Sequence, residues 1–221
     1  MPYLRWLSTL LLLALAAGLA YAVLSLPDQA QGLRLAVTEQ MPHSGVSHPV
    51  TAVLLNFRGY DTLLEMAVLL LALLGVWSLG GSASARPQAP PGSILDTLQR
   101  LLLPLLIIVA AYLLWSGAHA PGGAFQAGAV LGAAGVLLFL TGWQPPAGVT
   151  RHRLRFALVA GLVAFLAVAL LALAAGRQLL EYDPAHAGTI ILVIETLATV
   201  SIGVTLALLF SGADMAGNDQ Q

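Results

Sequence analysis

The stretch HAPGGAFQAG, from His119 to Gly128, lies between two long apolar runs and decides how the second half of the chain folds. Proline lacks a backbone N–H, and glycine adopts backbone angles that other residues avoid. We therefore expect Pro121, Gly122 and Gly123 to end one helix and to begin the next, as a tight hairpin. Gly128 and Gly132 then form a small-xxx-small ridge, which lets a neighbouring helix approach closely.

The composition is that of an integral membrane protein. Of the 221 residues, 58% are hydrophobic and only 9% are charged, whereas a soluble domain carries about 25% charged residues. The mean hydropathy of +0.87 agrees. The chain has no cysteine, so disulfides and thiolate metal sites are excluded, and its net charge of -1 gives no reason to expect a nucleic-acid partner.

The apolar runs predict an all-α fold with six transmembrane helices. Crossing the hydrocarbon core takes roughly 20 mostly apolar residues. Six stretches qualify or come close: Leu4–Leu26, Thr62–Gly80, Leu101–Gly117, Gly123–Gly142, Phe156–Gly176 and Thr189–Ser211. Pro104 would lie in the first turns of the third, and Pro49–Phe57 is short enough to be an interfacial helix. The first run is longer than the apolar core of a signal peptide, so we expect it to remain as a span.

Arginine placement predicts the orientation, because loops on the cytoplasmic side carry an excess of basic residues. All nine basic residues are arginine, and the densest cluster is RHRLR (Arg151–Arg155). If the N-terminus is cytoplasmic, six arginines lie inside and only Arg34, Arg58 and Arg177 lie outside. Six spans then return the C-terminus to the cytoplasm.

A proline-, glycine- and serine-rich segment, GSASARPQAPPG at residues 81–92, predicts a linker. It divides a two-span unit (residues 1–80) from a four-span unit (residues 93–221). No internal repeat relates the two, which argues against an inverted-repeat transporter. The outer loop at residues 27–49 holds prolines, glycines and two histidines, so we expect irregular structure there.

Two carboxyl groups lie within the predicted spans, where ionisable side chains are costly and usually functional. Glu65 lies in the first turns of the second span, and Glu195 lies about two turns into the sixth. Thr199 follows Glu195 by one turn, which places both on one polar strip and makes Thr199 a further candidate for an ion path. Two interpretations stay open for each acid: a part in an ion path, or a hydrogen bond that holds helices together.

Three further residues are weaker candidates. Asp61 is one turn before Glu65 and could join an ion path, cap the second span or pair with Arg58 near the interface. His119 can titrate near physiological pH, but it lies in the expected hairpin, where it can simply be solvated. No metal-ligand spacing, cofactor fingerprint or catalytic nucleophile is recognisable, so we expect no cofactor, no metal and no enzyme activity of the chain itself.

The hairpin resembles the signature of the B subunit of Mrp-type multisubunit sodium/proton antiporters, roughly G-H-x-x-P-G-G-G-F-x-x-G. Gly117, Pro121, Gly122, Gly123, Phe125 and Gly128 match that pattern. Ala124 stands in place of the third glycine, and His119 lies one place after the position of the family histidine. The resemblance covers residues 93–221, including the four-span layout.

The first half resembles a second part of the same machinery. NFRGYDTLLE (Asn56–Glu65) is similar to the run D/N-F-R-G-x-D-T-x-x-E in the C-terminal segment of the large Mrp A subunit, which is a separate small subunit in membrane-bound hydrogenases. The resemblance implies a fusion of two neighbouring parts, located in a bacterial or archaeal cell membrane. It also implies partners: other antiporter subunits, including a large complex I-like proton-pumping subunit, with Na+ and H+ as the transported ions.

The resulting hypothesis is an accessory subunit of a cation/proton antiporter that lines or supports an ion path. Because the chain has no lysine and only six predicted spans, it does not match the pumping subunits that the resemblance places beside it. Two alternatives stay open: a membrane subunit of a related redox-driven ion pump, and a purely structural adaptor between larger subunits.

Overall fold

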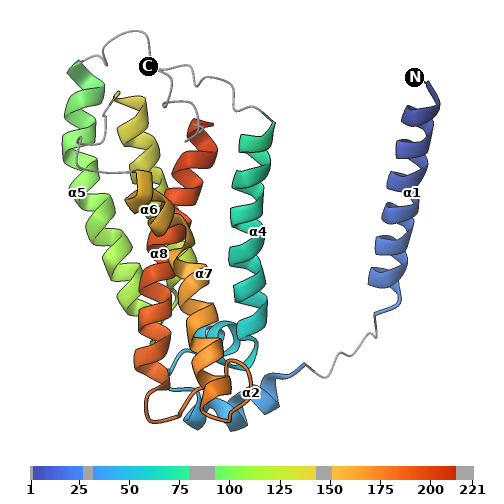
Figure 1. The fold of residues 1–221 in the computed structure, drawn as a ribbon, viewed down its shortest axis with the longest axis vertical. Coiled ribbons are helices and arrows are strands. Elements are labelled where there is room, and N and C mark those ends of the chain that lie inside the picture. Colours follow the sequence, from blue (N-terminus) through green and yellow to red (C-terminus); the bar gives the residue numbers. More distant parts are fainter. Residues whose placement is uncertain (1, 27–31, 80–92, 143–150, 213–221) are drawn as a thin grey trace. The chain divides into compact units, whose positions relative to one another are not determined.

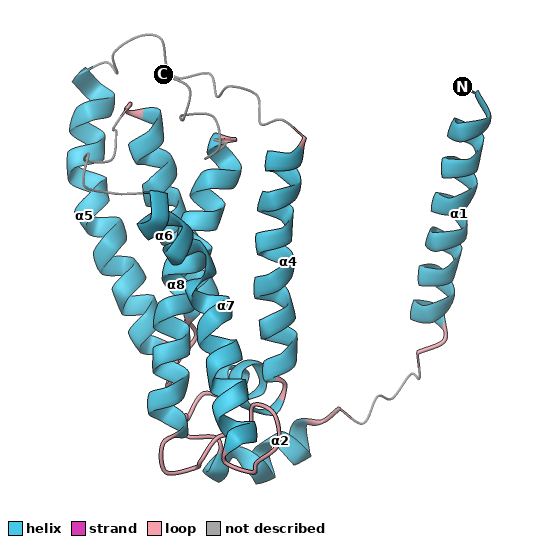
Figure 2. Cartoon of the chain, viewed as in Figure 1, coloured by secondary structure: helices cyan, strands magenta, loops and turns pink. Residues whose placement is uncertain are grey.

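The computed structural model describes residues 2–26, 32–79, 93–142 and 151–212, and the described part is helical (Figure 2). It divides into two compact units, residues 1–36 and 37–221, which are treated separately below. The predicted linker at residues 81–92 lies outside the described residues. In chain order the elements are α1 (Pro2–Leu24), α2 (Arg34–Gln40), η1 (Met41–His43), α3 (Pro49–Ala52), η2 (Val53–Phe57), α4 (Gly59–Ser78), α5 (Ser93–Ser116), α6 (Ala124–Leu140), α7 (Arg151–Ala174) and α8 (Ala187–Ser211).

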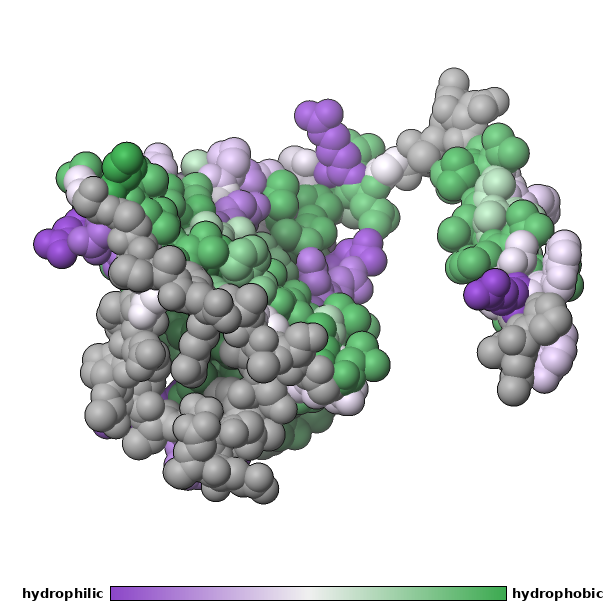
Figure 3. Space-filling model, turned by 90° about the horizontal axis from the view of Figure 1, so that it is seen from above, coloured by the Kyte–Doolittle hydropathy of each residue, from purple (hydrophilic) through white to green (hydrophobic). Residues whose placement is uncertain are grey.

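Five of the described helices, α1, α4, α5, α7 and α8, are long and apolar enough to cross a membrane. The chain is therefore a multi-pass membrane protein. The fourth predicted span, Gly123–Gly142, corresponds to α6, which is apolar but has only 17 residues. In Figure 3 apolar residues cover most of the described helix surface in view, as expected for helices that face lipid or other membrane subunits.

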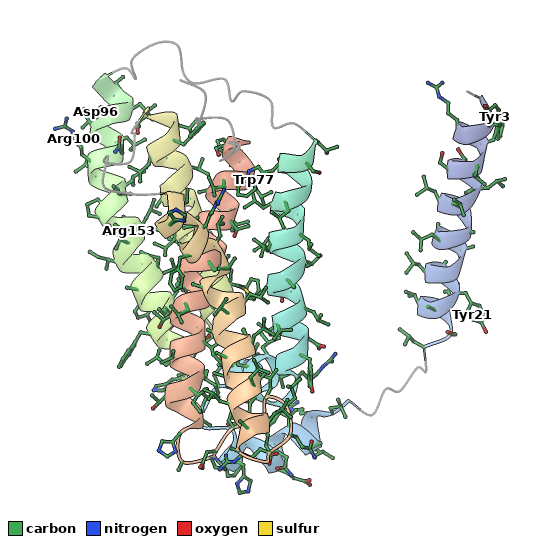
Figure 4. All side chains as sticks on the ribbon, viewed as in Figure 1. Tyr3, Tyr21, Trp77, Asp96, Arg100 and Arg153 are labelled. Atoms are coloured by element: carbon green, nitrogen blue, oxygen red, sulfur yellow. The ribbon has the colours of Figure 1, made fainter. Side chains whose placement is uncertain are left out.

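The N-terminal unit contains α1, whose apolar residues run around the whole helix instead of along one stripe. Such a helix is typical of a membrane span. Figure 4 shows Tyr3 and Tyr21 near its opposite ends. Aromatic side chains gather at both membrane surfaces, so their spacing suits a helix that crosses once.

In the second unit α5, α6, α7 and α8 alternate in direction, and α4 packs against α7 and α8 (Figure 1). The closest packing is between α6 and α8. A Cβ built on Gly128 would lie 2.7 Å from the Ile202 Cβ, and one built on Gly132 would lie 3.0 Å from the Leu206 Cβ. The glycine ridge of α6 therefore lets α8 approach more closely than side chains would allow.

Several helix ends differ from the sequence prediction. The helix α5 begins at Ser93, two turns early, because an Asp96–Arg100 pair one turn apart (2.9 Å) extends its polar start. Figure 4 places this pair near the start of the helix. As a result, Pro104 lies well inside α5 instead of in its first turns. The arginines of RHRLR likewise lie within the first turns of α7 and not before it.

The segment before α4 is more ordered than predicted. The loop at residues 27–49 contains α2 and η1, so the expectation of irregular structure was wrong for its second half. Pro49–Phe57 is helical as predicted, as α3 followed by the π-helical η2. Arg58 (φ -130°, ψ 36°) breaks the helix, and α4 begins at Gly59. Asp61 therefore lies in the first turn of α4 and is not its cap. Its negative charge there interacts favourably with the positive end of the helix.

This segment is bound to the α5–α6 hairpin by hydrogen bonds. The backbone N–H groups of Ser47 and His48 both donate to the Ala118 carbonyl at 3.0 Å. The Thr51 hydroxyl donates to the Gly117 carbonyl at 2.5 Å. Gly45 (φ 78°) packs so closely on the start of α8 that a Cβ there would lie 2.6 Å from the Gly188 nitrogen. The hairpin thus fixes the entry to α4.

Candidate functional site

The acid on α8, Glu195, is buried inside the bundle beside the hairpin. Its side chain is 3% exposed. The first N–H of α6, from Ala124, donates to Glu195 Oε1 at 3.3 Å. Gly123 precedes it with φ 107°, and a Cβ at that position would lie 2.7 Å from the same oxygen. A glycine is required here for its backbone angle and for the space that the carboxylate occupies.

Glu65 borders the same cavity as Glu195. This inner cavity has a volume of about 320 Å³, and its lining includes Thr51, Thr62, Glu65, Phe125, Gln126 and Glu195. Glu65 is the seventh residue of α4 and Glu195 is the ninth of α8. At 1.5 Å per residue, they lie roughly 9 and 12 Å from helix starts that share one end of the bundle (Figure 1).

The two acids differ in exposure. Glu195 is buried, whereas Glu65 is exposed on α4. Glu65 also borders a second, open cavity of about 660 Å³, the lateral cavity, together with Val68, Ala72, Gln126 and Leu206, so it lies on the side of α4 that faces α6 and α8. A carboxylate on an outward face of a membrane helix needs a neighbour, because bare lipid offers it no partner.

His119 lies on the other side of Glu195. A hairpin cavity of about 230 Å³ is lined by residues that include Val46, Trp115, His119, Thr189 and Glu195. His119 itself is exposed, and its backbone N–H donates to the Ser116 carbonyl at 2.9 Å. The structure thus brings His119 into the surroundings of Glu195, although it does not place the two side chains in direct hydrogen-bond contact.

Thr199 and Asp61 are not among the residues that line the inner cavity. The Thr199 hydroxyl donates to the Glu195 carbonyl on its own helix at 2.7 Å. Asp61 forms an exposed ion pair with Arg58 at 2.5 Å. Of the hairpin residues, Gly122, Gly123 and Phe125 line the inner cavity, while Gly128 and Gly132 pack against α8. Pro121 is exposed at the turn, and its carbonyl accepts from the Ser116 hydroxyl at 3.4 Å.

Sequence reasoning missed Gln126. This residue lines both the inner and the lateral cavity, as Glu65 does, so it shares the inner cavity with both acids. The signal was present, because Gln126 is the only polar side chain in the sequence of α6. It was overlooked because it carries no charge, although an amide can both donate and accept hydrogen bonds.

The loop between α7 and α8 holds a separate polar cluster outside the spans. Arg177 donates to Asp183 at 2.9 Å, and this hydrogen bond lowers the pKa of the Asp183 carboxyl. Burial raises the pKa of the Tyr182 phenol, whose hydroxyl has no hydrogen-bond partner among the described residues. These groups fix the loop at which α8 begins, and none of them lines the inner cavity.

The class of protein follows from these features: a multi-pass helical membrane protein with carboxyl groups along cavities between its spans. Comparison with known families identifies it further. Residues 94–212 match the family described as "Domain related to MnhB subunit of Na+/H+ antiporter", so the chain belongs to that family. Residues 7–98 match a second family, MbhE, described as the E subunit of MBH. The two resemblances found in the sequence are thus confirmed as a fusion of two family segments.

Individual relatives agree with this assignment. A probable K(+)/H(+) antiporter A/B subunit of Rhizobium meliloti (strain 1021) is 27% identical over 164 residues, which cover 60% of this chain. The match covers only 16% of that longer relative.

Two solved structures contain similar chains. One is from the membrane-bound sulfane sulfur reductase, an archaeal respiratory membrane complex. It is 25% identical to this chain with a TM-score of 0.69, and the match covers 94% of this chain and 97% of that one. The other is from the Mrp complex of Dietzia sp. DQ12-45-1b. It is 21% identical with a TM-score of 0.65, and the match covers 98% of this chain and 26% of that one. The second likeness concerns the fold alone.

Proposed function

We propose that this chain is an accessory membrane subunit of a multisubunit Mrp-type antiporter that exchanges a monovalent cation, Na+ or K+, for protons. The observation that carries the proposal is that Glu65 and Glu195, on two different helices, border one cavity between spans. Membership of the antiporter subunit family supports it. In this proposal the two acids line the ion path, and the hairpin residues hold its geometry.

The proposed topology has six spans with both termini in the cytoplasm of a bacterial or archaeal cell. The span that the five long helices leave out is α6, the fourth in chain order, which at roughly 1.5 Å per residue is somewhat shorter than the hydrocarbon core of about 30 Å. We keep the division into a two-span part (residues 1–80), a linker (81–92) and a four-span part (93–221). The family segments at 7–98 and 94–212 support a boundary in this region.

The partners we propose are other antiporter subunits, including a large complex I-like proton-pumping subunit, and the lipid bilayer. The exposed position of Glu65 beside the open lateral cavity supports a neighbouring subunit next to α4. That neighbour would close the lateral cavity and supply a hydrogen-bond donor or a cation for the carboxylate.

A second candidate function is a membrane subunit of a redox-driven ion pump. The likeness to the sulfane sulfur reductase chain favours it, since almost the whole of each chain is covered. The same two acids would then line an ion path driven by electron transfer in other subunits. Isolation of the native complex separates the candidates: iron–sulfur or nickel–iron subunits favour the pump, and only antiporter subunits favour the exchanger.

The ion-path proposal is tested by exchanging the acids in the assembled complex. Glu65→Ala and Glu195→Ala are each expected to lower cation/proton exchange in membrane vesicles by about a hundredfold, the order of effect of a lost proton-transfer group. Glu39→Gln is the control, because Glu39 is an exposed carboxylate on α2 that lines none of these cavities.

Assembly is measured in the same membranes by co-purification of the other subunits. Normal exchange by both alanine variants would refute the ion-path role. If Glu65→Gln and Glu195→Gln keep exchange while loss of the whole chain dissociates the complex, the chain is a structural adaptor.

A further inference from the structure

Glu195 separates two cavities that have no other lining residue in common. The inner cavity lies toward Glu65 and Gln126, and the hairpin cavity lies toward His119 and Thr189. A side chain that is 3% exposed to solvent therefore borders space on both sides. The inner cavity of about 320 Å³ and the hairpin cavity of about 230 Å³ each have room for several water molecules, which take about 30 Å³ each in the liquid.

We infer that Glu195 is a proton-transfer group that connects these two cavities, and that the transported metal cation does not bind to it. The inference rests on the proposed function, and it names the ion that uses this part of the path. It also names the entrance: protons reach Glu195 through the hairpin cavity.

The Glu195 carboxylate lies at the N-terminus of α6, where the backbone N–H of Ala124 donates to Oε1. The positive end of a helix stabilises a charged carboxylate, so it opposes a bound metal cation and a bound proton alike. The two ions differ in what they need at this position. A proton needs only the second oxygen, Oε2, and leaves the Ala124 hydrogen bond in place, whereas a metal cation needs several further oxygen ligands.

A metal cation also needs an oxygen shell, and hard cations take about six oxygen ligands. Among the described residues, no group of three His, Cys, Asp or Glu side chains could hold a metal ion. The Glu195 carboxylate has one hydrogen bond among the described residues, from the Ala124 N–H, and a donor cannot ligate a metal ion.

No arginine or lysine side chain lines either of the two cavities that Glu195 borders. Among the residues that line the two cavities, the only other groups that can ionise are Glu65 and His119. Oε2 accepts no hydrogen bond from any residue that the structure describes. An unpaired buried carboxylate is costly, so this group is suited to take up a proton and pass it on.

The transfer needs no further reactant. A hydronium ion in the hairpin cavity gives its proton to Oε2, so an O–H bond forms on the carboxyl group and a water molecule remains. The bond breaks when a water molecule in the inner cavity accepts the proton and carries it toward Gln126 and Glu65. In the proposed topology the hairpin lies on the outer side, so protons enter from outside the cell.

The test uses two kinds of exchange in vesicles that contain the whole complex. Glu195→Gln keeps the size of the side chain but cannot carry a proton. We expect it to lower cation/proton antiport by about a hundredfold. Exchange of radioactive sodium or rubidium against the unlabelled ion needs no net proton transfer, and it should stay within about twofold of wild type. Loss of both activities in an assembled complex, or retention of antiport, would overturn the inference.

A second variant decides the matter even if cation/cation exchange is slow. Glu195→Asp keeps the carboxyl group but withdraws it from the Ala124 N–H. We expect a lower maximal antiport rate with an unchanged KM for the cation, because the cation binds elsewhere. A KM for sodium or potassium raised by about tenfold, which corresponds to about 1.4 kcal/mol of lost binding, would place the cation at Glu195 and refute the inference.

The entrance is tested by thiol labelling. The chain has no cysteine, so an introduced cysteine is the only thiol that it presents to the reagent. Thr189→Cys in the hairpin cavity should react with a membrane-impermeant cationic thiol reagent added from the outer side, and antiport should then fall. Ala129→Cys in the lateral cavity is the control. Inhibition only from the cytoplasmic side, or no effect of the modified Thr189→Cys, would contradict entry through the hairpin cavity.

These outcomes separate the inference from the function on which it rests. If Glu65→Gln stops exchange while Glu195→Gln does not, the ion-path function survives and the role of Glu195 is refuted. If neither variant alters exchange, both fail.

Discussion

The two acids of the inner cavity, Glu65 on α4 and Glu195 on α8, show how differently one chain can hold a carboxyl group in a membrane. Glu195 is 3% exposed and accepts a backbone N–H at 3.3 Å, so it is buried by the chain's own helices. Glu65 is exposed on α4, at the open lateral cavity. The difference teaches that one acid is enclosed by this chain alone, whereas the other lies open to a neighbour, which we propose to be another subunit.

The strongest way to break this comparison is to disturb Glu195 without changing any acid. Gly123→Ala is expected to lower antiport by about a hundredfold, because its Cβ would lie 2.7 Å from Glu195 Oε1 and φ is 107°. Antiport in vesicles is the measurement, with subunit co-purification as the control for assembly. Wild-type activity would show that Glu195 does not depend on the backbone of the hairpin.

The next test concerns the connection between the acids. Gln126→Leu removes the amide that borders both the inner and the lateral cavity, and we expect antiport to fall by about tenfold. Gln126→Asn keeps an amide and should recover part of the rate. If the leucine variant exchanges ions normally, Glu65 and Glu195 are linked by another route or act separately.

Two glycines, one on α4 and one in the contact between α6 and α8, test how closely the helices pack in each place. Gly128→Ala should destabilise the complex by about 1–3 kcal/mol, since its Cβ would lie 2.7 Å from the Ile202 Cβ. Gly75→Ala on α4 meets nothing within 4 Å, so it should be neutral or stabilise by about 0.5–1 kcal/mol. Thermal unfolding in detergent measures both, and equal effects would contradict the close packing of α6 on α8.

The smallest expected effect lies in the loop where α8 begins. The hydrogen bond from Arg177 lowers the pKa of Asp183, so the folded state is stabilised above the ordinary aspartate pKa and loses this as pH falls through the lowered value. Asp183→Asn should be slightly less stable than wild type at neutral pH, and the difference should vanish in acid. The pair is exposed to solvent, which keeps the effect small. A difference in stability between Asp183→Asn and wild type that grows as the pH falls would contradict this prediction.

The sequence alone was sufficient for the membrane class, for the hairpin and for the placement of Glu65 and Glu195 within helices. These depend on local signals: apolar length, the Pro121–Gly123 break and charge within a span. It was not sufficient to show that Glu65 and Glu195 border one cavity, because that depends on the packing of α4 against α8. It also led to the wrong position for Pro104, since the polar first turns of α5 carry no apolar signal although Asp96 and Arg100 stabilise them.

The hydrogen bonds between the segment before α4 and the α5–α6 hairpin have a consequence for the fusion of the two family segments. Ser47, His48 and Thr51 belong to the first segment, and the carbonyls of Gly117 and Ala118 belong to the second. The two segments are therefore held together by direct hydrogen bonds. The covalent connection chiefly raises the effective concentration of one segment near the other. If the two segments are produced as separate polypeptides from one operon, we expect them still to assemble. The one-to-one stoichiometry should then hold only while both polypeptides are made together.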